Sequence, residues 1–221
     1  MQAGISETRN PPRWRRRKES RPGEILGAAL ETFTERGYES ARLEDIAKRA
    51  GCTKGTIFLY YESKEELFKA VVRDVMLPLL KDSEQAIEQH NGSCSELLER
   101  LLRFRWDRAT ASRVSGLAKL LFAETEHYPE LARFYYNEIH VQSQALIRRV
   151  LDRGVERGEF RPLDTTSVAR IAIAPIVFAS IWRHSFAPVS PNVDSEAYFK
   201  TTVDILMHGI TTGPPPDHAQ R

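Results

Sequence analysis

Cysteine is scarce in this sequence: among its 221 residues, only Cys52 and Cys94 carry a thiol. Two such distant cysteines form neither a disulfide framework nor a pair of metal ligands, as is usual in a reducing compartment. No apolar run approaches the roughly 20 residues needed to span a bilayer. The N-terminus is charged but has no apolar stretch behind it, so it does not have the form of a secretory signal. These absences predict a cytoplasmic protein that makes no membrane contact.

The short motifs of common enzyme classes are also missing. The sequence has no Gly-x-Ser-x-Gly elbow, no phosphate loop ending in Gly-Lys-Ser/Thr and no His-Glu-x-x-His zinc motif. One Glu-x-x-His is present, from Glu124 to His127, but a di-iron bundle needs two of them and further glutamates. We therefore expect a protein that is not an enzyme and that needs neither a metal nor a cofactor.

Strand-like alternation of apolar and polar residues is not sustained anywhere, whereas helical spacing recurs in almost every segment after residue 21. Leu26, Ala29, Leu30 and Phe33 occupy one helical face, and Gly37 follows at a position that suits a helix end. The pattern predicts an all-α fold of about nine helices.

Capping residues and breaks bound the later helices. Ser63 and Glu66 form a capping box at the start of a helix that Pro78 is expected to kink or break. After a break at residues 91–93, the spacing predicts a long helix from about 130 to 157. Further helices are predicted from about 165 to 186, capped by Asp164, and from about 194 to 210.

Charge is distributed unevenly, although the formal net charge is only +2. Between residues 9 and 21 only Glu19 opposes a group of basic side chains: Arg9, Arg13, Arg15, Arg16, Arg17, Lys18 and Arg21. Such a run is either a solvated flexible tail or an arm that binds nucleic acid. Both interpretations of residues 1–20 remain open.

Residues 43–61 have the pattern of a helix-turn-helix, in which Gly51 ends one helix and Thr53 caps a short second one. The second helix of this motif enters the major groove of DNA. A helix of this length is unstable alone, so Ile57 and Tyr61 are expected to hold it by packing. The residues between them, 58–60, must then face outward, unless they merely cover adjoining helices.

The side chains around this helix have chemistry that suits a DNA duplex. Lys54 and Lys64 can neutralise phosphates, and the Tyr60 hydroxyl can donate to a phosphate oxygen. Thr56 can reach a base edge, and Gly55 removes bulk where the backbone would approach a phosphate closely. Phe58 and Leu59 can pack on a sugar or a thymine methyl.

The stretch "LEDIAKRAGCTKGTIFLYYESKEELFKAVV" closely resembles the N-terminal DNA-binding region of the TetR/AcrR family of bacterial transcriptional regulators. This resemblance implies a homodimer on a palindromic double-stranded operator, with a cavity for a small-molecule effector in the C-terminal helices. The expected function is that of a ligand-responsive repressor. By position, the resemblance assigns the following residues to DNA contacts: Thr53, Lys54, Gly55, Phe58, Tyr60 and Lys64.

Two residues depart from the family pattern. Leu59 stands where a histidine is often found, so we expect an apolar contact there in place of a polar one. Arg42 stands where a serine or threonine commonly begins the helix, so the usual cap is lost and a phosphate contact becomes possible. Both residues are included among the predicted DNA contacts.

The resemblance also predicts how the chain is organised. The basic arm is followed by a DNA-binding head at 21–66, a ligand-binding and dimerisation body at 67–212 and a disordered tail at 213–221. The last two helices are expected to form the dimer. Aromatic side chains of the body are candidates for the cavity, with core packing as the alternative for each: Phe104, Trp106, Phe122, Tyr135, His140, Phe178 and Trp182.

Two competing hypotheses concern other chemistry. An apolar helical body could also belong to an enzyme or a small-molecule carrier, with the head serving as a protein-interaction module; the lack of any paired acid and base argues against it. Cys52 could sense oxidants, although a structural thiol is the ordinary interpretation of a single cysteine in this turn.

Overall fold

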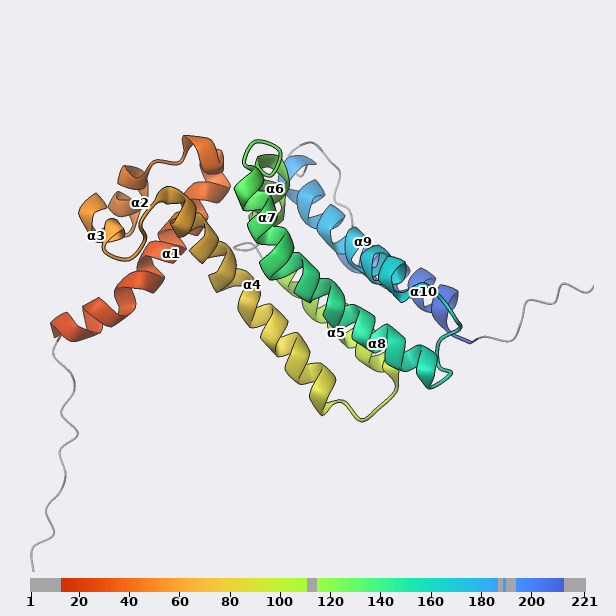
Figure 1. Cartoon of the computed structure of the whole chain (residues 1–221). Helices are drawn as coiled ribbons and strands as arrows, with labels where there is room; N and C mark the ends of the chain where they lie inside the picture. The colour runs from red at the N-terminus through yellow and green to blue at the C-terminus, as the bar shows by residue number, and fades with distance from the viewer. Residues whose placement is uncertain (1–12, 111–114, 187–188, 190–193, 213–221) are drawn as a thin grey trace, which may run out of the picture. The chain divides into compact units, whose positions relative to one another are not determined.

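A computed structural model describes residues 13–110, 115–186, 189 and 194–212, and it confirms the predicted all-α class over these residues (Figure 1). The one extended pairing within these ranges is an isolated bridge between Phe160 and Thr211. The chain divides into two compact units, residues 1–71 and 72–221. The functions predicted for the head and the body can therefore be considered unit by unit.

The first unit packs its helices around an aromatic cluster. Its elements are α1 (Arg13–Ser40), α2 (Leu43–Arg49), α3 (Lys54–Phe58) and the beginning of α4 (Lys64–Gln89). The Phe68 ring lies 5.2 Å from that of Phe33 and 5.1 Å from that of Tyr38, both edge-on. Ile46 and Ile57 are fully buried. This core holds the short helices α2 and α3, which could not persist alone in water.

Helix α1 corrects the prediction of a flexible arm, because it begins at Arg13 and is helical through residue 20. Arginine, lysine and glutamate, which dominate this stretch, are good helix formers. Pro22 lies inside α1, and Gly37 (φ 79°, ψ 167°) interrupts the helix near its end. The positive φ of Gly37 is the conformation that only glycine adopts without strain. Residues 1–12 of the predicted arm lie outside the described residues, as does the predicted disordered tail.

The second unit holds the remaining helices. Its elements are the rest of α4, α5 (Cys94–Thr110), α6 (Ser115–Glu124), α7 (Pro129–Tyr135), the π-helical turn η1 (Tyr136–His140), α8 (Val141–Glu156), α9 (Thr165–Phe186) and α10 (Ser195–Ile210). The backbone passes from α7 through η1 into α8 without leaving helical geometry, as predicted for one long helix. With these three counted as one, the described ranges contain nine helices.

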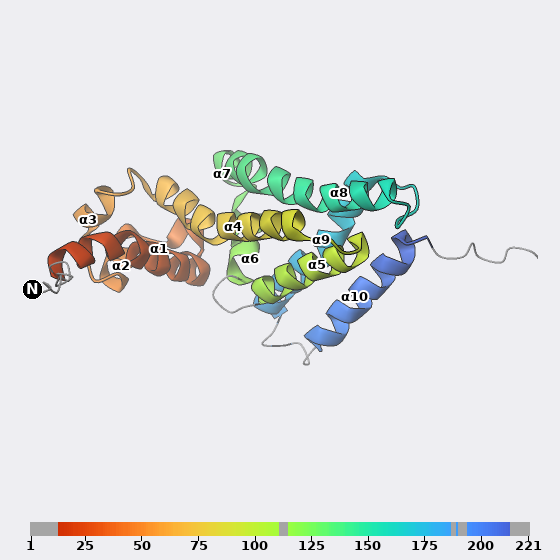
Figure 2. The same ribbon diagram turned by 90° about the horizontal axis from the view of Figure 1, so that it is seen from below.

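The core of this unit lies between α5, α8 and α9, with α6 packed on α9 and α10 packed on α5 and α9 (Figure 2). Leu98 and Ile147 are fully buried in it. A Cβ added at Gly154 would lie 2.1 Å from the Phe160 ring, so only glycine permits this close approach. The Asp164 carboxylate caps α9 by accepting from the backbone N–H of Thr166 at 3.1 Å, as predicted.

The structure differs from the expectations at Pro78, at the end of α3 and in α9. Helix α4 continues through Pro78 to Gln89 and is not broken there. Helix α3 ends at Phe58 and not near Tyr61. Helix α9 is long and apolar enough, by length and composition, to cross a membrane, and only 22% of its most apolar window is buried. In the sequence, Arg170 interrupts this stretch, so the uninterrupted apolar run covers only residues 171–182.

Candidate nucleic-acid interface and ligand pocket

The turn between α2 and α3 is closed by backbone hydrogen bonds around a glycine. The N–H of Cys52 donates to the carbonyl of Ala47 at 2.9 Å, and the N–H of Gly51 donates to that of Lys48 at 3.3 Å. Gly51 has a φ of 62°, as this helix-ending arrangement requires. The turn therefore fixes where α3 begins.

Helix α3 is capped and anchored as predicted. The Thr53 hydroxyl oxygen accepts from the backbone N–H of Thr56 at 3.1 Å, which makes Thr53 the N-cap. Ile57 is fully buried and Tyr61 is half-buried, so both can hold the helix against its neighbours.

The residues between these anchors face outward. Phe58 is 45%, Leu59 81% and Tyr60 37% exposed. The alternative that they cover adjoining helices does not account for such exposure, least of all for Leu59. The surface required for DNA contact is therefore present, and the contacts themselves stay a prediction.

Gly55 has no role in the packing of the first unit. It is exposed, and an added Cβ would meet only the Thr53 hydroxyl, at the ordinary distance of 3.8 Å. Its φ does not lie in the left-handed region either. Nothing among the described residues therefore requires glycine at this position. A bound partner could require it, as a DNA phosphate close to the backbone would.

Lys54 is held by an acid in the unbound protein. Its Nζ lies 2.7 Å from Oε1 of Glu44 on α2, and 5.8 Å from the centre of the Phe58 ring. The hydrogen bond from Lys54 lowers the pKa of Glu44. Both side chains are exposed, so the pair stabilises little and a phosphate can compete for the lysine.

Lys64 has a different environment from the one predicted. Its Nζ donates to the carbonyl oxygens of Tyr38 at 2.8 Å, Glu39 at 3.0 Å and Ala41 at 3.3 Å, and it lies 4.6 Å from the centre of the Tyr38 ring. An ammonium group has three donors. Lys64 therefore stabilises the end of α1, and a phosphate contact would have to replace one of these bonds.

Thr56 and Arg42 occupy the two remaining predicted positions. The Thr56 hydroxyl shares a hydrogen bond of 2.9 Å with that of Thr53, so it is already partnered in the unbound protein. Arg42 is exposed at the N-cap of α2 and makes no side-chain capping bond, as the sequence predicted. It borders an open polar hollow together with Arg36, Glu44 and Asp45.

Cys52 does not have the environment of a redox sensor. Its thiol is half-buried, and burial raises its pKa. Because the thiolate is the reactive form, a raised pKa makes the group less reactive at neutral pH. A structural role in the turn is the better interpretation.

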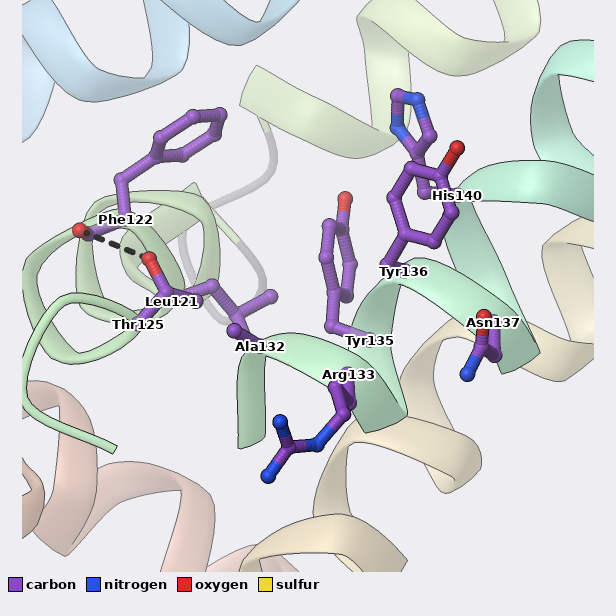
Figure 3. A pocket seen from close by; sticks show the side chains of 9 residues that line it. All are labelled: Leu121, Phe122, Thr125, Ala132, Arg133, Tyr135, Tyr136, Asn137 and His140. Carbon is purple, nitrogen blue, oxygen red and sulfur yellow. Dashed lines mark hydrogen bonds between the residues drawn. The ribbon is translucent and has the colours of Figure 1, made fainter. Parts of the chain in front are cut away.

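The second unit contains a pocket of about 480 Å³ between α6 and the α7–η1 segment (Figure 3). Its lining consists of Leu121, Phe122, Thr125, Ala132, Arg133, Tyr135, Tyr136, Asn137 and His140. Three of the predicted cavity residues, Phe122, Tyr135 and His140, therefore meet in one place. Its volume falls within the range of small-molecule pockets, and its walls are mostly apolar.

The α7–η1 segment supplies six of the nine residues that line the pocket. Figure 3 shows Tyr135, Tyr136 and His140 rising from one side of this segment, whereas Arg133 and Asn137 point away. The rings of Tyr136 and His140 stack with their centres 5.4 Å apart. A π turn widens the helix locally and is often found at functional sites.

The other four predicted cavity residues do not line this pocket. Trp106 is buried against α10, with its ring 5.8 Å from that of Tyr198. Phe104 is half-buried beneath the Arg108 guanidinium. Phe178 and Trp182 are 54% and 38% exposed on α9. All four satisfy helical periodicity, which cannot distinguish a pocket wall from a core or an interface.

The sequence did not predict Arg105 or six of the nine lining residues: Leu121, Thr125, Ala132, Arg133, Tyr136 and Asn137. Arg105 lies four residues after the buried Leu101 and so falls on the buried face of α5, which spacing could have revealed. Its guanidinium donates through Nη1 to the Ser143 hydroxyl at 2.7 Å.

Two family profiles match most of the chain. The one described as "Bacterial regulatory proteins, tetR family" matches residues 25–71. The one described as "Tetracyclin repressor-like, C-terminal domain" matches residues 89–193. The first range contains the helix-turn-helix, and the second contains the pocket.

Individual relatives agree with this match. The HTH-type transcriptional regulator RutR of Escherichia coli (strain K12) is 26% identical over 210 residues, with 86% of this chain and 88% of RutR covered. The HTH-type transcriptional repressor KstR2 of Mycobacterium tuberculosis is 28% identical over 196 residues, covering 87% of this chain and 94% of KstR2. Among solved structures, the fatty acid degradation regulator FadR from Bacillus halodurans has the same fold, with a TM-score of 0.74 at 23% identity over 85% of this chain and 98% of FadR.

Proposed function

We propose that this chain, which belongs to the TetR family of bacterial transcriptional regulators, represses transcription as a homodimer bound to a palindromic operator. A small apolar or aromatic effector would release the dimer from the operator. As a member of the family it is a DNA-binding transcriptional regulator and not an enzyme. A bacterial regulator of this kind works in the cytoplasm, where the chromosome lies.

The observation that carries this proposal is the outward face of α3. A helix that is capped by Thr53 and anchored by Ile57 exposes Phe58, Leu59 and Tyr60. Contiguous exposed apolar side chains mark an interaction site, whereas scattered single ones do not. In a dimer, two such helices would enter successive major grooves, whose centres are about 34–36 Å apart.

The exposed side of α9 supports the dimer. Phe178, Trp182 and Phe186 form a continuous aromatic strip, with neighbouring ring centres 5.7 and 4.6 Å apart. Ile171 on α9 and Ile205 on α10 are 59% and 68% exposed. Packing against the same face of a second chain would cover this apolar surface, which a monomer would leave in water. Burial of this face in a dimer would also account for the apolar composition of α9, with no need for a membrane.

The pocket of the second unit supports an effector with an apolar or aromatic body. Its aromatic walls suit such a molecule, and its volume admits one of modest size. An effector that prefers a conformation with differently spaced heads weakens operator binding by its differential affinity for the two conformations.

A gel-shift titration with the DNA that flanks the gene tests the proposal. We expect a discrete complex with a short palindromic segment and none with a shuffled segment of equal length and composition. A carrier or an enzyme with a protein-interaction head would give the same weak, salt-sensitive binding to both segments.

A further inference from the structure

The charged end of Arg105 is buried in the second unit, and no described residue forms an ion pair with it. Its Nε and Nη2 atoms are inaccessible to solvent and have no hydrogen-bond partner among the described residues. Within the described ranges, the guanidinium makes one hydrogen bond, from Nη1 to the Ser143 hydroxyl. A buried polar group that is left unsatisfied is costly, and such exceptions in a folded protein call for an explanation.

The two unsatisfied atoms form one edge of the guanidinium group. The N–H bonds of Nε and Nη2 point in parallel, which is the side-on arrangement that matches the two oxygens of a carboxylate. Arg73 uses the same edge in this chain. Its Nε and Nη2 donate to the two carboxylate oxygens of Glu138 at 2.7 and 2.6 Å. The edge that Glu138 fills at Arg73 is therefore unfilled at Arg105.

Arg105 does not itself line the pocket, but its charge lies close enough to Tyr135, which does, to act on that phenol. Burial raises the pKa of Tyr135, which lines the pocket, and the positive charge of Arg105 acts on the phenol in the opposite direction. Burial also lowers the pKa of Arg105 to about 10, so the guanidinium is still charged at neutral pH. Ser143, its one partner, follows the pocket residue His140 by less than one helical turn.

We propose that Arg105 binds the acidic group of the effector, and that the effector is a monocarboxylic acid with an apolar or aromatic body lying in the pocket of Phe122, Tyr135, Tyr136 and His140. This inference rests on the proposed function and names the class of molecule that it left open. A carboxylate fits better than a phosphate, because its single charge neutralises one guanidinium whereas a phosphate would leave buried negative charge unpaired.

A structural role and a binding role for Arg105 predict different effects of its removal on the stability of the unliganded protein. A buried charge that is part of a satisfied network is strongly destabilising to remove, whereas replacing an unpaired one by an apolar side chain of similar length is neutral or stabilising. Residues kept for binding commonly cost stability in this way. The response of the unliganded protein to Arg105→Met therefore separates the two roles.

The experiment compares the wild type, Arg105→Met, Arg105→Lys and a control, Arg100→Met, which changes an exposed arginine of the same helix. Thermal melting and operator gel shifts are recorded with octanoate and phenylacetate, with the matched neutral amides octanamide and phenylacetamide, and with octanoyl-coenzyme A. Arg105→Lys keeps the charge but cannot form two parallel N–H bonds to one carboxylate.

We expect at least one of the acids to raise the melting temperature of the wild type and to release the operator, with its amide weaker by about tenfold or more. Arg105→Met should bind the operator, melt at an equal or higher temperature without acid, and lose the response to acid. Arg105→Lys should keep part of the response, and the Arg100→Met control should behave as the wild type.

The inference would be overturned by amides that act as well as their acids, by octanoyl-coenzyme A that acts more strongly than octanoate, or by an acid response that survives Arg105→Met. The absence of a response to either acid, or a lower melting temperature of unliganded Arg105→Met, would do so as well. A wild type that fails to bind any operator would instead contradict the proposed function, while the melting comparison of acids and amides would still test Arg105.

Discussion

Nζ of Lys54 lies 2.7 Å from Oε1 of Glu44, so the first basic residue of α3 is paired within the protein before any DNA is bound. The predicted phosphate contact of Lys54 must therefore compete with an acid on α2. Because both groups are exposed, that competition costs little, but the Glu44 carboxylate also repels nearby phosphates.

Glu44→Gln should tighten DNA binding, because it frees Lys54 and removes a negative charge from the predicted interface. We expect a several-fold gain at low salt and a salt slope steeper by up to about one unit. Binding is measured against salt concentration by fluorescence anisotropy. Glu99→Gln is the matched control, since it removes an exposed acid from α5 in the second unit. Equal gains in the two variants would mean that only the overall charge matters.

Gly55→Ala should separate DNA binding from stability. An added methyl meets no neighbour closer than 3.8 Å, and alanine favours helix, so the melting temperature should stay equal or rise. Crowding against a phosphate should cost about 1–3 kcal/mol of binding free energy. Gly23→Ala, in the open surroundings of α1, is the control for propensity alone. Unchanged operator affinity in Gly55→Ala would show that the backbone does not approach the DNA closely here.

Lys64→Met should destabilise the first unit whether or not DNA is present. The change leaves the carbonyls of Tyr38, Glu39 and Ala41 without their donor, at a cost of about 1–3 kcal/mol in the free energy of unfolding. Chemical denaturation measures the loss, with the exposed Lys48→Met as the control. A variant of unchanged stability that binds DNA weakly would mean that Lys64 serves the phosphate and not the helix end.

Leu59→Ala should weaken operator binding by about 1–2 kcal/mol, since apolar contact with a thymine methyl is lost. Stability should hardly change, because this side chain is 81% exposed. Replacing operator thymines by uracil removes the methyl groups one at a time. At one position, replacing thymine by uracil should weaken binding of the wild type but not of the Leu59→Ala protein. If the two losses of binding free energy add at every position, Leu59 contacts no thymine methyl.

Phe178→Glu should convert the dimer into monomers, because the charge would be buried between two apolar faces. Sedimentation velocity would show the change, and operator affinity would fall with it. Leu77→Glu is the matched control, since Leu77 is also an exposed apolar residue, 40% exposed on α4. A dimer that persists in Phe178→Glu would place the interface elsewhere than on α9.

Local chemistry made much of this protein predictable. Helix ends depend on residues within a few positions of each other, as the caps at Thr53 and Asp164 illustrate. The all-α class follows from the period of the apolar residues. The division of α3 into the buried Ile57 and the exposed Phe58 and Leu59 also follows from that period, given a neighbouring core.

The sequence by itself thus determined the helices, the helix-turn-helix and the outward face of α3, because each depends on neighbours along the chain. Tertiary structure alone decided that Phe122 borders a pocket while Trp106 is core, since both satisfy the same helical spacing. It also decided which charges have partners. Arg105 and Ser143 lie 38 positions apart, and the burial of that guanidinium arises only when α5 and α8 pack together.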